Sequence, residues 1–252
     1  MTTLPTDDPF AVLRSLTRAR IGLGRAGDGL PTAPLLAFQM AHAAARDAVH
    51  GAVDFARLAD ALAPHPTVEV ASAAADRALY LRRPDLGRRL AETAAERLPA
   101  GPFDVVIVIG DGLSASAVET NAVPTALALA ERLADLSLGP IVLASQARVA
   151  LGDPIGAAMN AEVVVMLIGE RPGLTAADSL GAYLTFRPVP GRRDSERNCV
   201  SNIHAHGLPP TVAADRLAWL VRAAIRLGLS GIDLKEDAPG ALPPAEPPPA
   251  LT

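Results

Sequence analysis

Apolar and polar residues follow two different patterns along the chain, and the pattern changes near residue 100. In residues 1–100 the apolar positions recur at intervals of three and four residues, which is the spacing of an amphipathic helix. Helices are expected at residues 35–49, 55–62 and 70–81, and again at 88–98 after Pro84 interrupts the pattern. We therefore predict a smaller N-terminal helical region ahead of the main domain.

Residues 101–236 instead alternate short apolar runs with amphipathic stretches. The runs predict strands at residues 103–109, 140–144, 163–168, 182–187 and 199–204. The stretches predict helices at residues 117–133, 153–159 and 213–227. This alternation is typical of an α/β fold with a doubly wound parallel sheet. The Pro- and Ala-rich tail, residues 237–252, is predicted to be disordered.

A charged turn follows the most apolar of these runs. Six apolar residues, from Val163 to Ile168, end at Gly169, and Glu170 comes next. In an open α/β sheet ligands bind outside the carboxyl ends of the strands, which is where this turn is expected. For one such turn alone, a solvated loop is the simpler interpretation.

A glycine-rich turn, from Gly110 to Ala115, joins the strand at 103–109 to the helix at 117–133. Its spacing matches G-x-G-x-x-A, in which backbone N–H groups at a helix start can bind a phosphate. The next strand, however, leads into Ser145, Gln146 and Ala147 and lacks the acidic residue that binds a dinucleotide ribose. We interpret the turn as a polar crevice wall. A non-enzymatic Rossmann-type nucleotide-binding module that uses this turn is the alternative hypothesis.

Composition narrows the classes of function. The 252 residues carry a net charge of −4, so neither nucleic acid nor an anionic membrane is expected as a partner. No apolar run approaches the roughly 20 residues of a membrane span, and the N-terminus lacks a signal-peptide pattern. These features favour a cytoplasmic protein.

The sequence shows no self-contained catalytic apparatus. Its only cysteine, Cys199, excludes an internal disulfide and a Cys-cluster metal site, and its five histidines form no H-E-x-x-H motif. It also lacks a P-loop and a G-x-S-x-G elbow. We therefore predict neither catalytic residues nor metal ligands in this chain.

Five further segments carry a family signal. They are ARIGLGRAG at 19–27, RPDLGRR at 83–89, SQARVALGDPIG at 145–156, LIGERPGL at 167–174 and RNCVSNIH at 197–204. Together they resemble the small (light) subunit of ethanolamine ammonia-lyase. The resemblance runs in order and at matching intervals from about residue 10 to about residue 235, which makes it more specific than any single motif.

The resemblance implies an adenosylcobalamin-dependent enzyme that converts ethanolamine to acetaldehyde and ammonia. It implies a TIM-barrel large subunit that binds ethanolamine, and a Rossmann-like domain in this chain that covers the lower face of the cofactor. The chain would then be one half of a cofactor site in a hetero-oligomer, inactive alone. Such a division agrees with the missing catalytic apparatus, because the cofactor supplies the chemistry and the protein supplies its position.

By the same resemblance, the cofactor-binding residues are Val149, Glu170 and Cys199. An ionised Glu170 can accept hydrogen bonds from corrin amides, and Val149 offers apolar contact. Cys199 is small enough to let the nucleotide tail approach. Without the resemblance, a core valine, a solvated glutamate and a buried inert cysteine are the simpler interpretations.

The segment NIHAHG, residues 202–207, differs by one residue from D-x-H-x-x-G, with which other cobalamin proteins bind cobalt through histidine. Asn202 is a poorer hydrogen-bond acceptor for His204 than an aspartate would be. We expect His204 to be a wall or hydrogen-bonding residue, while the cofactor's own benzimidazole stays on cobalt, as the resemblance implies.

Residues 21–29 form a glycine-rich loop with Arg18 and Arg20 just before it. We interpret it as an arm that binds the large subunit, because a loop with so many glycines becomes ordered only against a partner. A solvated linker is the alternative.

The chain begins close to the matching region, without the N-terminal extension of relatives that are packaged into bacterial microcompartments. Free cytosol is therefore expected, and a microcompartment is the less expected location.

Overall fold

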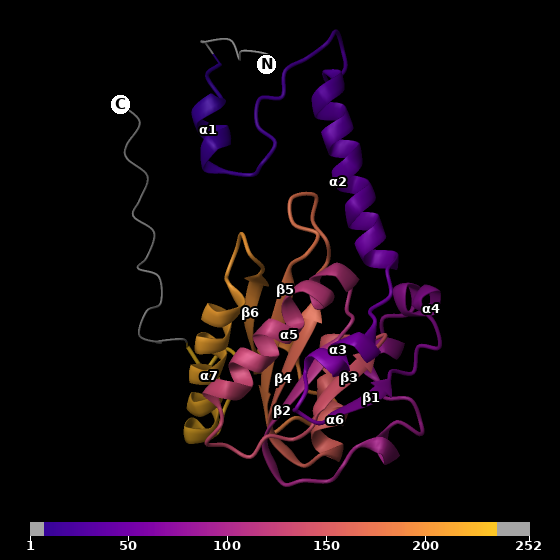
Figure 1. The fold of residues 1–252 in the computed structure, drawn as a ribbon, viewed down its shortest axis with the longest axis vertical. Helices are drawn as coiled ribbons and strands as arrows, with labels where there is room; N and C mark the ends of the chain where they lie inside the picture. The colour runs from indigo at the N-terminus through magenta and orange to yellow at the C-terminus, as the bar shows by residue number, and fades with distance from the viewer. Residues whose placement is uncertain (1–7, 236–252) are drawn as a thin grey trace.

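The centre of the protein is a six-stranded sheet, seen in a computed structural model that describes residues 8–235 (Figure 1). The strands are β1 (Thr67–Ala71), β2 (Phe103–Gly110), β3 (Ile141–Ser145), β4 (Ala161–Gly169), β5 (Leu180–Phe186) and β6 (Arg197–Ile203). The helices are α1 (Ala11–Leu16), α2 (Thr32–His50), α3 (Phe55–Ala61), α4 (Arg77–Arg82), α5 (Ala115–Arg132), α6 (Gly152–Ala158) and α7 (Pro210–Leu227). The predicted α/β class is confirmed. The tail at 237–252, predicted to be disordered, lies outside the described residues.

The strands lie in the order β1-β3-β2-β4-β5-β6. The first four in this order run parallel, whereas β5 is antiparallel to β4 and β6 is antiparallel to β5. The sheet is thus mixed, which corrects the prediction of a parallel sheet. The physical reason is the connection at residues 170–179, which contains no helix. A parallel return requires a crossover of a dozen residues or more, usually through a helix.

Of the helices predicted in the N-terminal region, the one at 70–81 forms only in its second half, as α4, and the one at 88–98 does not form. Val70 lies in β1, which pairs with β3, and α4 begins only at Arg77, where the Asp76 side chain accepts a hydrogen bond from the Leu79 N–H. Residues 88–98 contain the last residue of one short 3₁₀ turn, Leu86–Arg88, and the whole of another, Ala95–Arg97. At residues 67–71 the ladder with β3 overrides the helical spacing, because strand preference depends on tertiary neighbours.

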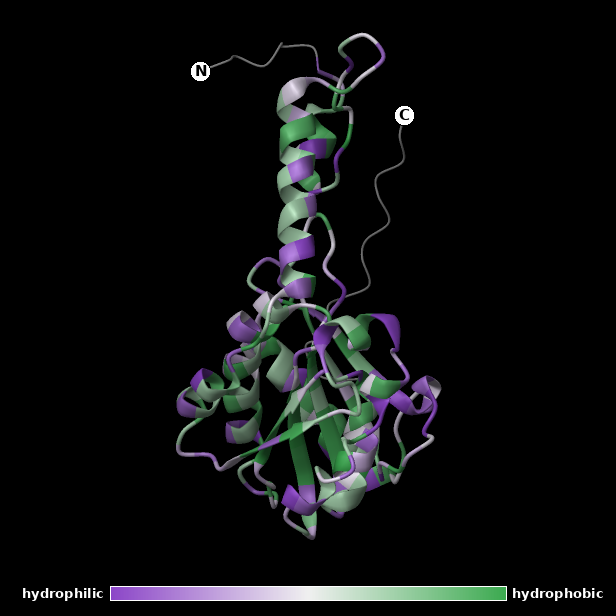
Figure 2. Cartoon of the chain, turned by 90° about the vertical axis from the view of Figure 1, so that its right-hand side faces the viewer, coloured by the Kyte–Doolittle hydropathy of each residue, from purple (hydrophilic) through white to green (hydrophobic). Residues whose placement is uncertain are grey.

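Helices cover both faces of the sheet, but unequally (Figure 1). On one face α5 and α7 pack over alternate strand residues such as Val105 and Val163. On the other face α6 packs on β4, over Val164 and Met166. Figure 2 shows the resulting hydrophobic centre around the strands. Burial on both faces explains the continuous apolar runs of β2 and β4 in the sequence.

The helix α2 projects from the body as an arm (Figures 1 and 2). Of its 19 residues only Ala48, near the carboxyl end, is buried. The loop at 17–31 joins α1 to α2, and within it the Arg20 guanidinium donates a hydrogen bond to the Leu174 carbonyl at 3.1 Å. This contact places the loop beside the turn that follows β4. No helix within residues 8–235 is long and apolar enough to cross a membrane.

Candidate functional site

Two adjoining cavities lie near the carboxyl end of β4 and along the neighbouring face of β5 and β6. We call them the Cys199 cavity, of about 290 Å³, and the Glu170 cavity, of about 140 Å³. Arg148, Val149 and Tyr183 line both. The structure therefore brings Val149, Glu170 and Cys199, which are far apart in the sequence, to one place.

Val149 begins a 3₁₀ turn that leads from β3 into α6. The turn is anchored on both sides, since the Arg148 N–H donates to the Gly87 carbonyl at 2.8 Å and the Leu151 side chain is buried. Val149 itself is half-buried and faces the two cavities. It is thus a fixed apolar wall rather than a core valine.

Glu170 is the first residue after β4, and its side chain lies against β5. Its Oε2 accepts a hydrogen bond from the Ser179 hydroxyl at 2.5 Å, and its N–H donates to the Ser179 carbonyl at 3.0 Å. A Cβ at Gly181 would lie 3.0 Å from Oε1, so this glycine makes room for the carboxylate. Among the described residues no donor reaches Oε1. One carboxylate oxygen is therefore positioned by the protein and the other is available to a ligand.

Cys199 on β6 and Tyr183 on β5 are cross-strand partners. The Cys199 side chain is exposed, which corrects the interpretation as a buried cysteine. Surrounding protein nevertheless desolvates the thiol and raises its pKa; the Glu170 charge adds to this, and a hydrogen bond with Tyr183 opposes it. Desolvation, followed by the neighbouring Cys199, also raises the pKa of the Tyr183 hydroxyl. Both groups are neutral near pH 7, which suits a contact surface better than a nucleophile.

In such sheets ligands usually bind outside the carboxyl ends of two neighbouring strands whose connections leave in opposite directions. These strands are β2, which leads to β3, and β4, which leads to β5, and the Glu170 cavity lies at their ends. The neighbouring space, between the carboxyl ends of β2 and β3, is different. Here the protein fills it with its own side chains. The Asp111 carboxylate accepts hydrogen bonds from the Gln146 and Ala147 N–H groups at 3.0 and 2.9 Å. The Tyr80 hydroxyl lies 2.9 Å from the Gly112 carbonyl and 2.8 Å from the Ala147 carbonyl. We call this the closed crevice.

Burial dominates the electrostatics of the closed crevice. It raises the pKa of Tyr80 to about 12, against the opposing charge of Arg148. It also raises the pKa of Asp111, although the backbone N–H bonds and the Arg77 guanidinium at 3.4 Å counteract it. The hydroxyl is therefore neutral at physiological pH, and its proton is donated within the fold, to the Gly112 and Ala147 carbonyls.

The glycine-rich turn at 110–115 is packed against β4. Gly112 has a φ of +57°, and a Cβ there would lie 2.3 Å from the Gly169 carbonyl oxygen. At the start of α5, Ser114 accepts from the Ala117 N–H at 3.1 Å and donates to the Ala177 carbonyl at 2.6 Å. The turn thus packs closely against β4 and the loop after it, and these segments occupy the space in which a nucleotide phosphate would lie. Gly112 lines the Glu170 cavity, which confirms the interpretation of the turn as a crevice wall.

Arg148 is a site residue that was missed by the sequence analysis. Its guanidinium carbon lies 4.3 Å from the centre of the Tyr80 ring. Its Nε is buried and has no hydrogen-bond partner within residues 8–235. One signal in the sequence could have pointed to this place. The chain has only two tyrosines, Tyr80 and Tyr183, and both border these cavities.

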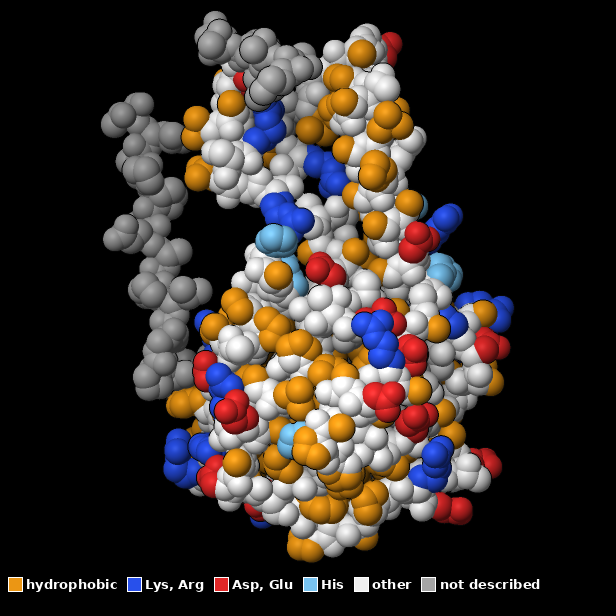
Figure 3. Space-filling model, in the orientation of Figure 1, with side chains coloured by type: hydrophobic (Ala, Val, Ile, Leu, Met, Phe, Trp, Pro, Cys, Tyr) orange, Lys and Arg blue, Asp and Glu red, His pale blue; other side chains and the backbone are white. Residues whose placement is uncertain are grey.

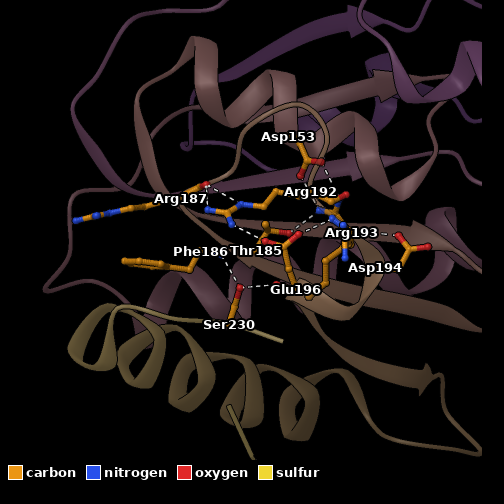
Figure 4. Close-up of polar contacts among 10 residues, drawn as sticks. Asp153, Thr185, Phe186, Arg187, Arg192, Arg193, Asp194, Glu196 and Ser230 are labelled. Atoms are coloured by element: carbon orange, nitrogen blue, oxygen red, sulfur yellow. Dashed lines mark hydrogen bonds and ion pairs between the residues drawn. The ribbon is translucent and has the colours of Figure 1, made fainter. Parts of the chain in front are cut away.

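A buried ion pair forms the floor of the Cys199 cavity. Two nitrogens of the Arg197 guanidinium each donate to one oxygen of Asp153 at 2.6 Å, and one of them also reaches the Thr185 hydroxyl at 2.8 Å. Figure 4 shows Asp153 and Thr185 pointing into this polar cluster. Burial alone would lower the pKa of Arg197, but the Asp153 carboxylate outweighs it and raises the pKa. The pair fixes β6 to α6 beneath the cavity.

His204 is buried, and both of its ring nitrogens are engaged locally. Nε2 is 2.8 Å from the Asn202 Oδ1, and Nδ1 accepts from the His206 N–H at 3.2 Å. This arrangement assigns the proton to Nε2 and confirms the expected hydrogen-bonding role. Within the part of the chain that the structure describes, no group of three His, Cys, Asp or Glu residues could hold a metal ion.

A larger cavity, of about 470 Å³, lies at the opposite end of the sheet. It is formed around the start of β2, the start of β4 and the loop after β5, with residues such as Phe103, Glu162 and Arg187. None of the predicted site residues borders it. Its size therefore does not make it the better candidate.

Comparisons with known proteins agree on one family. The sequence profile described as ethanolamine ammonia-lyase light chain (EutC) matches residues 7–235. Relatives named "Ethanolamine ammonia-lyase small subunit" include that of Bradyrhizobium diazoefficiens, 53% identical over 93% of this chain and 93% of the relative. Those of Xanthomonas campestris pv. campestris and Pseudomonas aeruginosa are both 49% identical, over 94% and 92% of this chain and 90% and 89% of the relatives.

Proposed function

Since this chain belongs to the ethanolamine ammonia-lyase light chain family, we propose that it is the small subunit of an adenosylcobalamin-dependent ethanolamine ammonia-lyase. The subunit would bind the lower face of the cofactor. The observation that supports this most directly is the convergence of Val149, Glu170 and Cys199 on two adjoining cavities.

The size of the cavities supports a shared site. A pocket that encloses a drug-sized ligand has about 300–1,000 Å³, and a corrinoid is larger still. At about 290 and 140 Å³, the Cys199 and Glu170 cavities would hold only projecting groups of the cofactor. The chain would then supply one wall, and a partner the other.

The residues present fit such a cofactor. Oε1 of Glu170 is available to accept hydrogen bonds from corrin amides, and Val149 offers an apolar edge. The side chains of Tyr183 and Cys199 are both neutral, so they can contact a bulky group without placing a charge beside it. Arg148 lines both cavities, and its Nε donor, which has no partner within residues 8–235, can serve a ligand oxygen. When bound, adenosylcobalamin supplies the radical chemistry, and these side chains hold it in position.

We further propose that residues 8–50, that is α1, the glycine-rich loop predicted to bind a partner and α2, bind the large subunit, a TIM barrel that carries the ethanolamine site. Figure 3 shows apolar side chains on the surface of α1 and α2, and exposed apolar patches of this kind mark interaction surfaces. The exposed apolar residues are Phe10, Val12, Leu13 and Leu16 at α1, and Leu30, Leu35, Leu36, Phe38 and Met40 at α2. The chain alone would be inactive, and the assembled enzyme would lie in the cytoplasm rather than in a microcompartment.

Reconstitution of the two subunits tests this function. We expect ammonia release from ethanolamine when this chain, the large subunit and adenosylcobalamin are combined, and none when any one is omitted. Turnover by the isolated chain, or turnover of the pair without the cofactor, would contradict the proposal. Titration of the pair with NAD tests the nucleotide-binding alternative, and saturable NAD binding would favour that alternative.

A further inference from the structure

We propose that Arg148 binds the phosphodiester of the cofactor's nucleotide tail and so fixes the direction in which the cofactor lies across the two cavities. This inference rests on the proposed function and assigns a specific contact within that site. Three observations support it: the position of the Arg148 side chain, its Nε donor without a hydrogen-bond partner, and the charges around the Cys199 cavity.

Arg148 is held rigidly at the junction of the two cavities. Its N–H donates to the Gly87 carbonyl at 2.8 Å, and its guanidinium stacks over Tyr80, whose hydroxyl is fixed in the closed crevice. A Cβ at Gly87 would lie 2.9 Å from both the Arg148 Cγ and the Tyr80 ring, so Gly87 provides the space for this stack. The side chain is therefore prepared for a ligand rather than free to sample many rotamers.

The donors of Arg148 are not satisfied inside the protein. Its Nε is buried, and no hydrogen bond from its guanidinium reaches another residue within 8–235. A buried donor without an acceptor is costly, and native structures leave few of them. An oxygen of a ligand that enters either cavity would answer it.

The charges around the Cys199 cavity favour an anion. Three arginines line it, Arg88, Arg148 and Arg197. Arg197 is neutralised by Asp153, whereas Arg88 and Arg148 have no ion pair among the described residues. The one carboxylate on this wall, Asp194, is 84% exposed and lies 3.7 Å from Arg197.

The Glu170 cavity shares Arg148 with the Cys199 cavity, but its inner wall also carries the Glu170 carboxylate, which lies between Gly181 and Ser179. Arg171 also borders it, but that side chain is exposed. A corrinoid carries neutral amides around its ring and one permanent negative charge, in the phosphodiester of its tail. Amides would therefore lie toward Glu170, and the tail toward Arg148 and Cys199. A guanidinium that presents its planar edge can bind two phosphate oxygens at once.

The test compares a ligand that has the tail with one that lacks it. Cyanocobalamin and dicyanocobinamide are titrated by visible absorption into the two-subunit complex, with wild-type chain, Arg148→Ala, Arg148→Lys and Arg88→Ala. Arg88→Ala is the comparison, because it removes a second positive charge from the same cavity but an exposed and unstacked one. We expect Arg148→Ala to weaken cyanocobalamin by about 10- to 100-fold, the size of a charge-assisted hydrogen bond, and cobinamide by less than about threefold. Arg148→Lys should lie between, and Arg88→Ala should weaken cyanocobalamin by less than Arg148→Ala does, because an exposed charge is screened by solvent.

Three results would overturn the inference while leaving the function intact. The first is unchanged cyanocobalamin affinity in Arg148→Ala. The second is an equal loss for both ligands, which would assign Arg148 to the corrin ring or to the fold. Inorganic phosphate that stabilises wild type but not Arg148→Ala, with no change in the ratio of the two corrinoid affinities, would identify a free-phosphate site and also overturn it. Absence of cyanocobalamin binding by the wild-type complex would instead remove the proposed function itself.

Discussion

The closed crevice and the two open cavities lie at the same edge of the sheet, yet they are built for different purposes. In the closed crevice, the polar atoms of Asp111 and Tyr80 meet backbone groups of the chain itself. In the open cavities, Oε1 of Glu170 and Nε of Arg148 have no hydrogen-bond partner among residues 8–235. The space between β2 and β3 has thus become part of the core, whereas the candidate site stays open at the switch in strand order between β2 and β4 and extends toward β5 and β6.

The comparison predicts that changes in the closed crevice act on the fold and changes in the open cavities act on the ligand. The largest effect is expected for Tyr80→Ala. Tyr80 is fully buried, so its removal leaves a cavity and two carbonyls without their donor, at a cost of about 3–5 kcal/mol in the free energy of unfolding. Urea unfolding of the cofactor-free chain measures it, with Glu170→Ala as the control. A Tyr80→Ala protein as stable as that control would break the distinction.

Tyr80→Phe sharpens the same point through pH. The pKa of Tyr80 is raised from 10.0 to about 12, so its contribution to stability is fully present below about pH 10 and is lost as the pH rises toward 12. Two pKa units correspond to about 2–3 kcal/mol. We expect the wild type to lose this much more stability than Tyr80→Phe between pH 10 and 12, in parallel denaturation curves. Identical pH profiles would show that the hydroxyl is not held neutral by the crevice.

Glu170 provides the opposite case, in which the ligand is affected and the fold is not. A charge-assisted hydrogen bond contributes about 1.5–3 kcal/mol, so Glu170→Ala should weaken adenosylcobalamin binding by roughly tenfold to a hundredfold. Glu170→Gln keeps the shape and should lose less. Neither should lower the unfolding temperature without cofactor, because the residue lies on a half-buried turn. Unfolding of the cofactor-free variant, or unchanged affinity, would assign Glu170 to the structure.

The smallest effect concerns the reactivity of Cys199. Its thiol is exposed but has a raised pKa, so few thiolates exist at pH 8. At that pH, iodoacetamide should alkylate the Cys199 thiol more slowly than it alkylates the thiol of glutathione. Bound cofactor should slow the alkylation of Cys199 further. Mass spectrometry can follow the reaction, since this is the only cysteine of the chain. Alkylation faster than glutathione would mean that the thiol is activated rather than neutral.

Local sequence determined most elements of the main domain. The apolar runs predicted at 103–109 and 163–168 correspond to β2 and β4, and the amphipathic stretch at 213–227 corresponds to α7. A strand buried on both faces requires a continuous apolar run, and a helix buried on one face requires apolar residues with a 3.6-residue period. Both patterns involve only neighbouring residues, so local sequence is enough to predict these elements. The family, too, follows from short segments in order, and three of those segments contain Val149, Glu170 and Cys199.

Tertiary structure decided the rest, because the decisive contacts join residues far apart in the chain. β1 is a strand only through its ladder with β3, some 74 positions away at Thr67 and Ile141. The antiparallel course of β5 depends on a helix-free connection that returns along β4. Tyr80 closes the crevice by reaching carbonyls 32 and 67 positions along the chain, and Arg148 becomes a site residue only because that ring lies beneath it. No spacing in the sequence encodes such contacts, since they exist only once the sheet has brought its strand ends together.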